Sequence, residues 1–199
     1  MKILVIGATG AIGQAAAAAL AVRHDVIAAS RSSTAYPVDI TRHESVQALF
    51  ERVGRVDAIV STAGGLHFGP LGEMTAAQFQ IGLHDKLLGQ VDLALTGQHF
   101  LNDGGSITLT SGIVAEEPIA QGANASAVNS ALEGFARGAA IELARGIRIN
   151  VVSPNVLQES MDVYGAFFRG FEAVPASRVA QAYVRSVEGA QTGRTYKVW

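Results

Sequence analysis

Short runs of apolar residues alternate with longer stretches of helical periodicity from one end of the chain to the other. The short runs consist mostly of valine, isoleucine and leucine without strict apolar–polar alternation, which is typical of strands that are covered on both faces. Segments of this kind lie at Lys2–Ile6, Asp25–Ala29, Tyr36–Val38, Asp57–Ser61, Ser106–Thr110, Arg148–Val152 and Thr195–Val198. Because strands that alternate with helices form βαβ units, the pattern predicts a doubly wound parallel sheet in a three-layer α/β/α fold.

The stretches between these strands predict helices. The first is rich in alanine, a strong helix former whose small side chain suits close packing on a strand. Two others follow a capping-box pattern, at Thr41–Glu44 and at Thr75–Gln78. The predicted helices are Ile12–Val22, Val46–Val53, a long helix running from Thr75 toward His99, Ala123–Arg145 and Ala176–Val187.

One connection departs from the βαβ pattern. Only Arg31 to Ala35 separate the second predicted strand from Tyr36–Val38. A parallel crossover usually needs a dozen or more residues. Either the crossover helix between the second and third strands is shortened or lost, or Tyr36–Val38 is a vestigial strand.

Length and composition fit a single globular domain over residues 1–199, with 49% hydrophobic and 16% charged residues. The net charge of −2 gives no electrostatic reason to expect nucleic acid or a membrane as a partner. The absence of cysteine excludes disulfides and thiolate metal sites, and we expect no metal. The first apolar run is too short for a signal peptide or a membrane span, so we expect a cytoplasmic protein.

The first predicted strand leads through Gly7-x-x-Gly10-x-x-Gly13 directly into the first predicted helix. Glycines in this context permit a tight turn and the close approach of the backbone to a pyrophosphate, and the helix N-terminus offers free N–H groups and a positive dipole end. The pattern favours a dinucleotide site in a Rossmann-type fold, with Thr9 and Ile12 also at the ligand. A glycine turn with a purely structural role is the alternative.

The end of the second predicted strand indicates which dinucleotide binds. Proteins that use NAD usually carry an acidic residue there for the ribose hydroxyls. This chain has Ser30, Arg31 and Ser32 instead, and Asp25 lies at the opposite end of the strand. Arginine pairs with a phosphate and stacks on adenine, while the serines donate hydrogen bonds. We therefore expect NADP(H) to be preferred over NAD(H); a solvated loop arginine is the alternative.

With these features, the sequence resembles the short-chain dehydrogenase/reductase family along nearly its whole length. The matching segments follow the family order: Gly7–Gly13, Asp39-Ile40, Ser61-Thr62-Ala63-Gly64, Thr110-Ser111-Gly112, Asn129–Phe135 and Ile149–Pro154. The resemblance implies that Asp39 and Ile40 hold the adenine, that Ala63 and Gly64 line the cofactor, and that Ser111 is the catalytic serine. It also implies nicotinamide contacts from Pro154 and Leu157. Glu159 replaces a threonine of the family, a departure that affects the pyrophosphate contact.

The positions of the family's catalytic Tyr-x-x-x-Lys motif fall on Ala125 and Asn129. Lys86 stands instead where the family carries a fourth catalytic residue, an asparagine. The two helices concerned pack side by side in the family, so the resemblance implies that Lys86 and Asn129 meet. Asn129 would then bind the ribose hydroxyls, and a partly desolvated Lys86 of lowered pKa would act as the acid while Ser111 polarises a carbonyl. An ordinary surface lysine is the alternative.

Two further residues are weaker candidates for the substrate site. His67 follows the Ala-Gly-Gly stretch, near where a substrate would enter, and histidine titrates near neutral pH. Tyr164 lies in Ser160–Phe171, a segment that resembles the family's mobile substrate loop. A solvated histidine, and a loop whose phenylalanines serve only for apolar closure, are the alternatives.

Two functions are compatible with these features. The first is an NADP(H)-dependent oxidoreductase with non-standard catalytic residues, which transfers hydride between nicotinamide and a small carbonyl or alcohol. The second is a non-catalytic NADP(H)-binding redox sensor or scaffold. The retained Ser111 and the apolar loop Ser160–Phe171 favour the enzyme, whereas the missing Tyr-x-x-x-Lys motif favours the non-catalytic binding protein. The resemblance implies a homodimer or homotetramer, and the sequence does not identify the small-molecule substrate.

Overall fold

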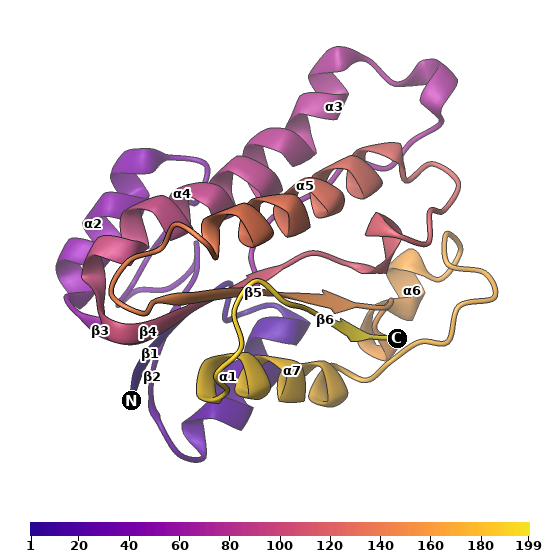
Figure 1. Ribbon diagram of the computed structural model, residues 1–199. Coiled ribbons are helices and arrows are strands. Elements are labelled where there is room, and N and C mark those ends of the chain that lie inside the picture. Colours follow the sequence, from indigo (N-terminus) through magenta and orange to yellow (C-terminus); the bar gives the residue numbers. More distant parts are fainter.

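The computed structural model describes all of residues 1–199 and contains one sheet of six strands in the order β2-β1-β3-β4-β5-β6 (Figure 1). The strands are β1 (Lys2–Ile6), β2 (Asp25–Ala29), β3 (Val56–Ser61), β4 (Leu101–Thr110), β5 (Arg148–Pro154) and β6 (Thr195–Val198). All neighbouring strands are parallel, so their carboxyl ends lie at one edge of the sheet. The strand order reverses beside β1, and open α/β sheets bind ligands in the crevice at such a point.

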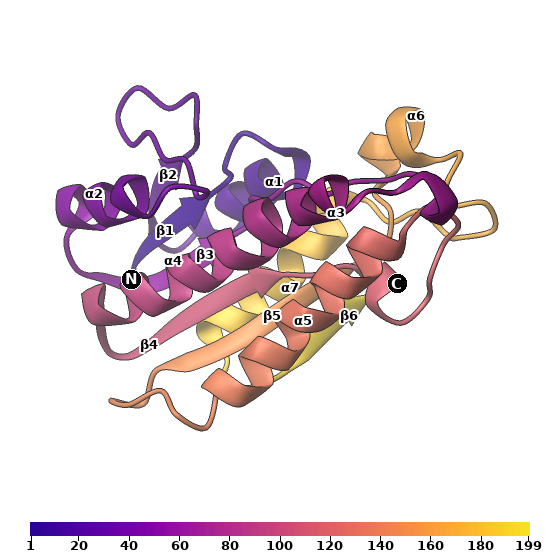
Figure 2. The ribbon, with the colours of Figure 1, turned by 90° about the horizontal axis from the view of Figure 1, so that it is seen from above.

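Helices cover both faces of the sheet, which confirms the predicted three-layer fold (Figures 1 and 2). One face carries α1 (Ala11–Ala21) and α7 (Ala176–Glu188), whose core includes the fully buried Leu20 and Tyr183. The other face carries the remaining long helices over a core that includes Phe50. These helices are α2 (His43–Val53), α4 (Gly89–Gly97) and α5 (Ala123–Ala139), with the shorter α3 (Ala76–Gly82) before α4.

Short helical segments complete the secondary structure. α6 (Met161–Tyr164) lies in the loop between β5 and α7. Single 3-10 turns are found at Leu71–Glu73, Gln98–Phe100, Ile113–Ala115 and Gln158–Ser160. No helix of the chain has both the length and the apolar character that crossing a membrane requires.

The third predicted strand, Tyr36–Val38, is wrong as a strand. The structure reduces it to an isolated bridge between Ser30 and Pro37, and β2 becomes the edge of the sheet. The bridge consists of two hydrogen bonds, from the Ser30 N–H to the Tyr36 carbonyl at 3.4 Å and from the Val38 N–H to the Ser30 carbonyl at 3.1 Å. No helix lies between β2 and α2, so the crossover helix is lost as predicted and the strand beyond it is vestigial.

Two predicted helix ends also differ from the structure. Thr41 and Glu44 do not form a capping box, because Thr41 donates from both its backbone N–H and its hydroxyl to Asp39 Oδ1, and Arg42 precedes α2 without a side-chain cap. The capping box of Thr75 and Gln78 is confirmed. α5 ends at Ala139 rather than Arg145, which lies in a turn with a φ of 58°.

The predicted long helix toward His99 is interrupted. Between α3 and α4 the chain forms a π-helical stretch, Leu83–Leu88, which contains Lys86. A π-helical turn holds one more residue than an α-helical turn and is frequent at functional sites. Lys86 is the one buried residue of this stretch.

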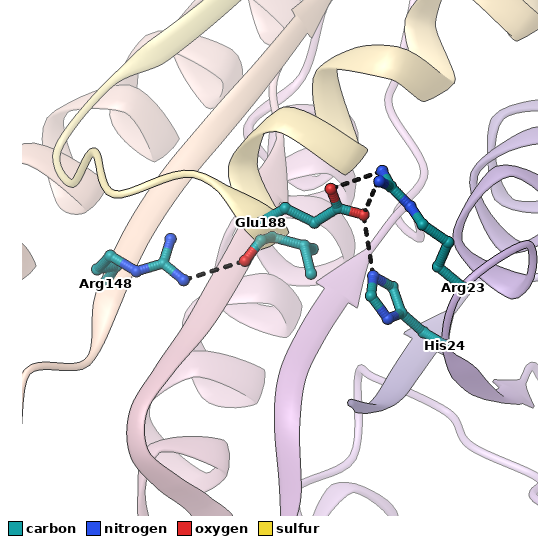
Figure 3. A network of polar contacts seen from close by, with 5 residues as sticks. Arg23, His24, Arg148 and Glu188 are labelled. Atoms are coloured by element: carbon teal, nitrogen blue, oxygen red, sulfur yellow. Dashed lines mark hydrogen bonds and ion pairs between the residues drawn. The ribbon is translucent and has the colours of Figure 1, made fainter.

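A network of polar contacts joins α7 to the amino end of the sheet (Figure 3). Arg23 donates two hydrogen bonds to Glu188, and His24 contacts the same carboxylate at 2.9 Å. Arg148, the first residue of β5, donates to the carbonyls of Ser186 and Val187 at 2.8 and 3.0 Å. These contacts satisfy the last carbonyls of α7, which have no partner within the helix.

Candidate functional site

Two adjoining clefts open at the carboxyl edge of the sheet. The first, which we call the glycine cleft, has a volume of about 470 Å³ and is formed by the loops after β1 and β2. The second, the lysine cleft, has a volume of about 280 Å³ and reaches the ends of β4 and β5. Both clefts are lined by Thr62, Ala63, Gly64 and Gly65, which follow β3. The two clefts therefore adjoin at the end of β3.

Most sequence-predicted site residues line one of these clefts. In the glycine cleft these are Gly7, Thr9, Gly10, Ser30, Arg31, Ser32, Asp39 and Ile40. In the lysine cleft they are Ile12, Lys86, Ser111, Asn129, Pro154, Leu157 and Tyr164, and Ala63 and Gly64 line both clefts. Gly13 and His67 line neither cleft.

The three glycines after β1 differ in why their positions suit glycine. Gly7 has a φ of 85°, and a Cβ on Gly13 would lie 2.1 Å from the Gly7 carbonyl oxygen, so both are required by the turn itself. A Cβ on Gly10 would meet no atom closer than 3.6 Å. Gly10 precedes α1 without a side-chain cap, so the first N–H groups of this helix are open to the cleft. The turn thus leaves free N–H groups and space where an anion can bind. A turn with a purely structural role would need neither.

The far end of the glycine cleft combines one cation with hydroxyl groups. Arg31 is exposed, while Ser30 is buried and its hydroxyl lies 3.3 Å from that of Ser32. The hydrogen bonds from Thr41, followed by the nearby positive charge of Arg31, lower the pKa of Asp39 below its usual value of 3.8. Asp39 is therefore ionised at neutral pH, and its Oδ2 atom accepts no hydrogen bond within the chain.

Lys86 is not a surface lysine, because only 8% of it is exposed. Its Nζ atom donates to the backbone carbonyl of Ser111 at 3.0 Å and forms no salt bridge with a carboxylate. Burial lowers the pKa of Lys86 from 10.5 to about 8. An ammonium group has three donors, so two of them remain for a ligand in the lysine cleft. A Cβ on Gly64 would lie 2.6 Å from the Lys86 side chain, which is why this position suits glycine.

Asn129 lies in the same cleft on α5. It is 1% exposed, and its Oδ1 atom is buried without a hydrogen-bond partner. Buried polar atoms are nearly always paired, and each exception needs an explanation. No hydrogen bond joins Asn129 to Lys86. The lysine cleft therefore offers free donors from one helix and a free acceptor from the other.

Ser111 has a partner that the sequence reasoning missed. Its hydroxyl donates to Glu133 Oε1 at 2.8 Å, and both residues are buried. Burial raises the pKa of the Glu133 carboxyl above its usual value of 4.5. Glu133 follows Asn129 by four residues on α5, so its spacing places both on one helix face. That spacing was the available signal.

Aromatic side chains close the outer side of the lysine cleft. Tyr164 and Phe68 both line it, with ring centroids 5.8 Å apart. Phe167 contacts Phe68 at 5.5 Å, and Phe168 also lines the cleft. This arrangement favours the apolar-closure alternative for the loop, and it also brings the Tyr164 side chain to the cleft.

Two other predicted positions have local structural roles. The backbone N–H of His67 donates to Asn124 Oδ1 at 3.0 Å. The Glu159 carboxylate accepts hydrogen bonds from the backbone N–H of Ala176 at 2.9 and 3.1 Å, at the first residue of α7. An acidic group is favourable at a helix N-terminus. Glu159 therefore fastens the loop between β5 and α7 to the first residue of α7, and it lines neither cleft.

Comparisons with known proteins place this fold in a family. A family model described as Enoyl-(Acyl carrier protein) reductase matches residues 6–193, which include every residue lining the two clefts. The structure of the protein lin1944 from Listeria innocua is 51% identical, with a TM-score of 0.98 over 100% of both chains. A small-chain dehydrogenase solved in complex with NADPH is 29% identical, with a TM-score of 0.90 over 100% of this chain and 96% of that one.

Curated relatives extend the comparison. Carbonyl reductase family member 4 of Danio rerio is 29% identical over 89% of this chain and 84% of its own length. Other relatives are longer, and this chain spans only 49–62% of their length.

Proposed function

The chain belongs to the short-chain dehydrogenase/reductase family and is an oxidoreductase, and we propose that it transfers hydride between NADP(H) and a small carbonyl or alcohol with non-standard catalytic residues. One observation carries the proposal: Lys86, Ser111 and Asn129 line one cleft that continues into the glycine cleft. A nicotinamide dinucleotide bound across both clefts supplies or accepts the hydride. The residues of this chain bind it, orient the substrate and handle the proton.

The two clefts fit such a cofactor. The open N–H groups at the start of α1 suit a pyrophosphate, and the unpartnered Asn129 Oδ1 suits a ribose hydroxyl. At the far end, Arg31, Ser30 and Ser32 suit a 2′-phosphate, and β2 does not end in the acidic residue that binds the ribose hydroxyls in proteins that use NAD. The ionised Asp39 lines the same cleft and is left for another part of the cofactor. We therefore propose that NADP(H) is preferred over NAD(H).

We assign the acid to Lys86 because the resemblance to the family aligns Ala125 and Asn129 with its Tyr-x-x-x-Lys motif, which leaves Lys86 as the acidic group in the cleft. With a pKa near 8, the ammonium donates a proton at neutral pH more readily than an ordinary lysine does. Ser111 polarises the substrate oxygen, and Pro154 and Leu157 hold the nicotinamide side of the cleft. The aromatic lid and the lack of any charged lining residue other than Lys86 favour a substrate with an apolar body.

Assembly and location belong to the same proposal. Leu88 and Leu95, on the segment from the π-helical stretch into α4, are 55% and 52% exposed, and an apolar groove lies between α4 and α5. A second copy of the chain packed on this surface would remove both leucines and the groove from water, which supports a homodimer or homotetramer. We also propose a cytoplasmic location, with which a sequence free of cysteine is compatible.

The experiment that tests the function follows NADPH oxidation with a panel of aldehydes, ketones and quinones. Wild-type protein is expected to turn over at least one substrate, and Lys86→Met and Ser111→Ala are expected to lower kcat at least about a hundredfold. Lys2→Met is the matched control, because Lys2 also donates to a single backbone carbonyl, at the other end of the sheet. NADPH binding without turnover of any panel member would instead support the redox sensor, which the substitutions at Ala125 and Asn129 favour.

A further inference from the structure

The Ser111 hydroxyl points its hydrogen away from the lysine cleft. It donates to Glu133 Oε1 at 2.8 Å, and it is the only side chain that donates to this carboxyl. A hydroxyl has a single hydrogen, so a serine that donates to Glu133 can only accept a hydrogen bond from a ligand. To polarise a carbonyl oxygen, Ser111 must donate into the cleft, and its bond to Glu133 must be reversed.

A protonated Glu133 reverses this bond. A neutral carboxyl donates its own O–H, so Ser111 can accept from Glu133 and donate toward the cleft. Burial already favours the neutral carboxyl, since Glu133 is only 6% exposed. The arrangement thus has two hydrogen-bond patterns that differ by one proton on Glu133.

The charged groups that face Glu133 come from three elements. Arg137 lies one turn further along α5, Glu116 follows the 3-10 turn after β4, and Lys197 lies on β6. Glu116 and Lys197 pair with each other at 2.5 Å. The repulsion from Glu116 opposes the attraction from Arg137 and Lys197, so burial and the bond to Ser111 are the larger influences on Glu133. Lys86 lies on the cleft side of Ser111 and contacts only its backbone carbonyl.

We propose that Glu133 is a positioning residue whose protonation decides whether Ser111 offers the lysine cleft a hydrogen-bond donor or an acceptor. With Glu133 neutral, Ser111 donates and the cleft suits a carbonyl oxygen. With Glu133 ionised, Ser111 accepts and the cleft suits an alcohol O–H. The role toward substrate rests on the proposed function, whereas the coupling between Ser111 and Glu133 does not.

The coupling is tested first on the free protein. Carbon-13 labelling of glutamate carboxyls gives one titration curve for each residue, and the signal that Glu133→Gln lacks belongs to Glu133. Its midpoint is expected above the usual 4.5 and is expected to rise further in Ser111→Ala, because the carboxylate then loses its donor. Glu117→Gln is the control, because it removes an exposed carboxylate that is not among the groups acting on Glu133. It is expected to leave the Glu133 titration curve unchanged. The same midpoint in wild type and Ser111→Ala would overturn the proposal.

The second test measures kcat/KM for carbonyl reduction against pH. In wild type and Glu117→Gln it is expected to fall about tenfold for each pH unit above the Glu133 midpoint, until it reaches a lower plateau. Glu133→Gln is expected to lose this limb while keeping any limb near pH 8 that belongs to Lys86. If kcat/KM of Glu133→Gln fell with pH in the same range as that of wild type, the positioning role would be refuted. Absence of turnover in every variant would refute the proposed function instead, and the carboxyl titration alone would then decide the coupling.

Discussion

The two ends of the sheet treat their charged side chains in opposite ways. At the amino end, Arg23 and His24 share the Glu188 carboxylate, and Arg148 caps the carbonyls of α7 (Figure 3). At the carboxyl end, the ammonium of Lys86 is buried against a single carbonyl with no carboxylate in contact. The amino end is arranged for stability, while the carboxyl end holds an unneutralised charge.

Lys2 and Lys86 make the contrast most directly. Each donates from Nζ to one backbone carbonyl, Val53 for Lys2 and Ser111 for Lys86. Lys2 remains partly exposed, whereas Lys86 is buried. Burying a charge without a partner costs free energy that an apolar residue would not cost. Groups held at such a cost are typical of functional sites, where stability is given up for chemistry.

The largest expected effect comes from removing that buried charge. Below pH 8, Lys86 is protonated in both the folded and the unfolded chain, and burial penalises only the folded one. A pKa lowered from 10.5 to about 8 corresponds to about 3 kcal/mol. Lys86→Met is therefore expected to raise the free energy of unfolding at pH 7 by about that amount, measured by urea denaturation.

The pH dependence of unfolding tests whether the gain in stability comes from the buried charge of Lys86. The penalty is complete below pH 8 and fades as the pH rises toward 10.5, where the unfolded lysine also loses its proton. The advantage of Lys86→Met over wild type is thus expected to shrink between pH 8 and pH 10.5. A variant that is destabilised equally at both pH values would contradict the contrast between the two ends.

A second prediction concerns the cation at the rim of the glycine cleft. Arg31→Ala is expected to weaken NADPH binding between about tenfold and a hundredfold, because a charge-assisted hydrogen bond to phosphate is lost. NADH affinity is expected to change much less. Fluorescence titration of both nucleotides provides the measurement, and an equal loss for both would remove the 2′-phosphate assignment.

At the amino end the expected effect has the opposite sign. Arg148→Met keeps the length of the side chain but removes two hydrogen bonds to the last turn of α7. We expect the free energy of unfolding to fall by about 1–2 kcal/mol. Thermal and urea unfolding measure this loss, and NADPH affinity should stay at the wild-type value. A large loss of affinity with intact folding would show that the two ends are not separable.

The smallest effect is expected at the ion pair on the same end. Glu188→Gln removes the charge that Arg23 and His24 share, and Arg23 is 63% exposed. Such pairs contribute about 0.5 kcal/mol and are screened by salt. Unfolding measured at low and high salt should show a small difference from wild type that diminishes as salt is added. A salt-independent loss above 2 kcal/mol would be too large for an exposed pair.

The fold was readable from the sequence because unalternated apolar strands and amphipathic helices recur in order. The exceptions have local causes. Tyr36–Val38 has strand composition, but Asp39 and Thr41 after it form a side-chain-bonded turn, and only one bridge to Ser30 remains. Thr41 and Glu44 have the spacing of a capping box, but Asp39 lies two residues earlier and takes both Thr41 donors. Short-range side-chain competition of this kind is not visible in periodicity.

The candidate site was readable only in part. The resemblance to the short-chain dehydrogenase/reductase family was enough to predict that Lys86, Ser111 and Asn129 share one site, and all three line one cleft of the structure. The spacing of four residues from Asn129 places Glu133 on the same helix face, but Glu133 was missed because its bond to Ser111 also depends on the rotamers of both side chains. His67 was placed at the substrate entrance by its position after the glycines, but its backbone turns to bond Asn124. The roles of these residues stay predictions.

The most direct test of the central claim is titration of the purified wild-type protein with NADPH and NADH, followed by nucleotide fluorescence. We expect saturable binding of NADPH and clearly weaker binding of NADH, with NADPH affinity reduced in Arg31→Ala and retained in Arg148→Met. Failure to bind either nucleotide would contradict the assignment of the two clefts at the carboxyl edge.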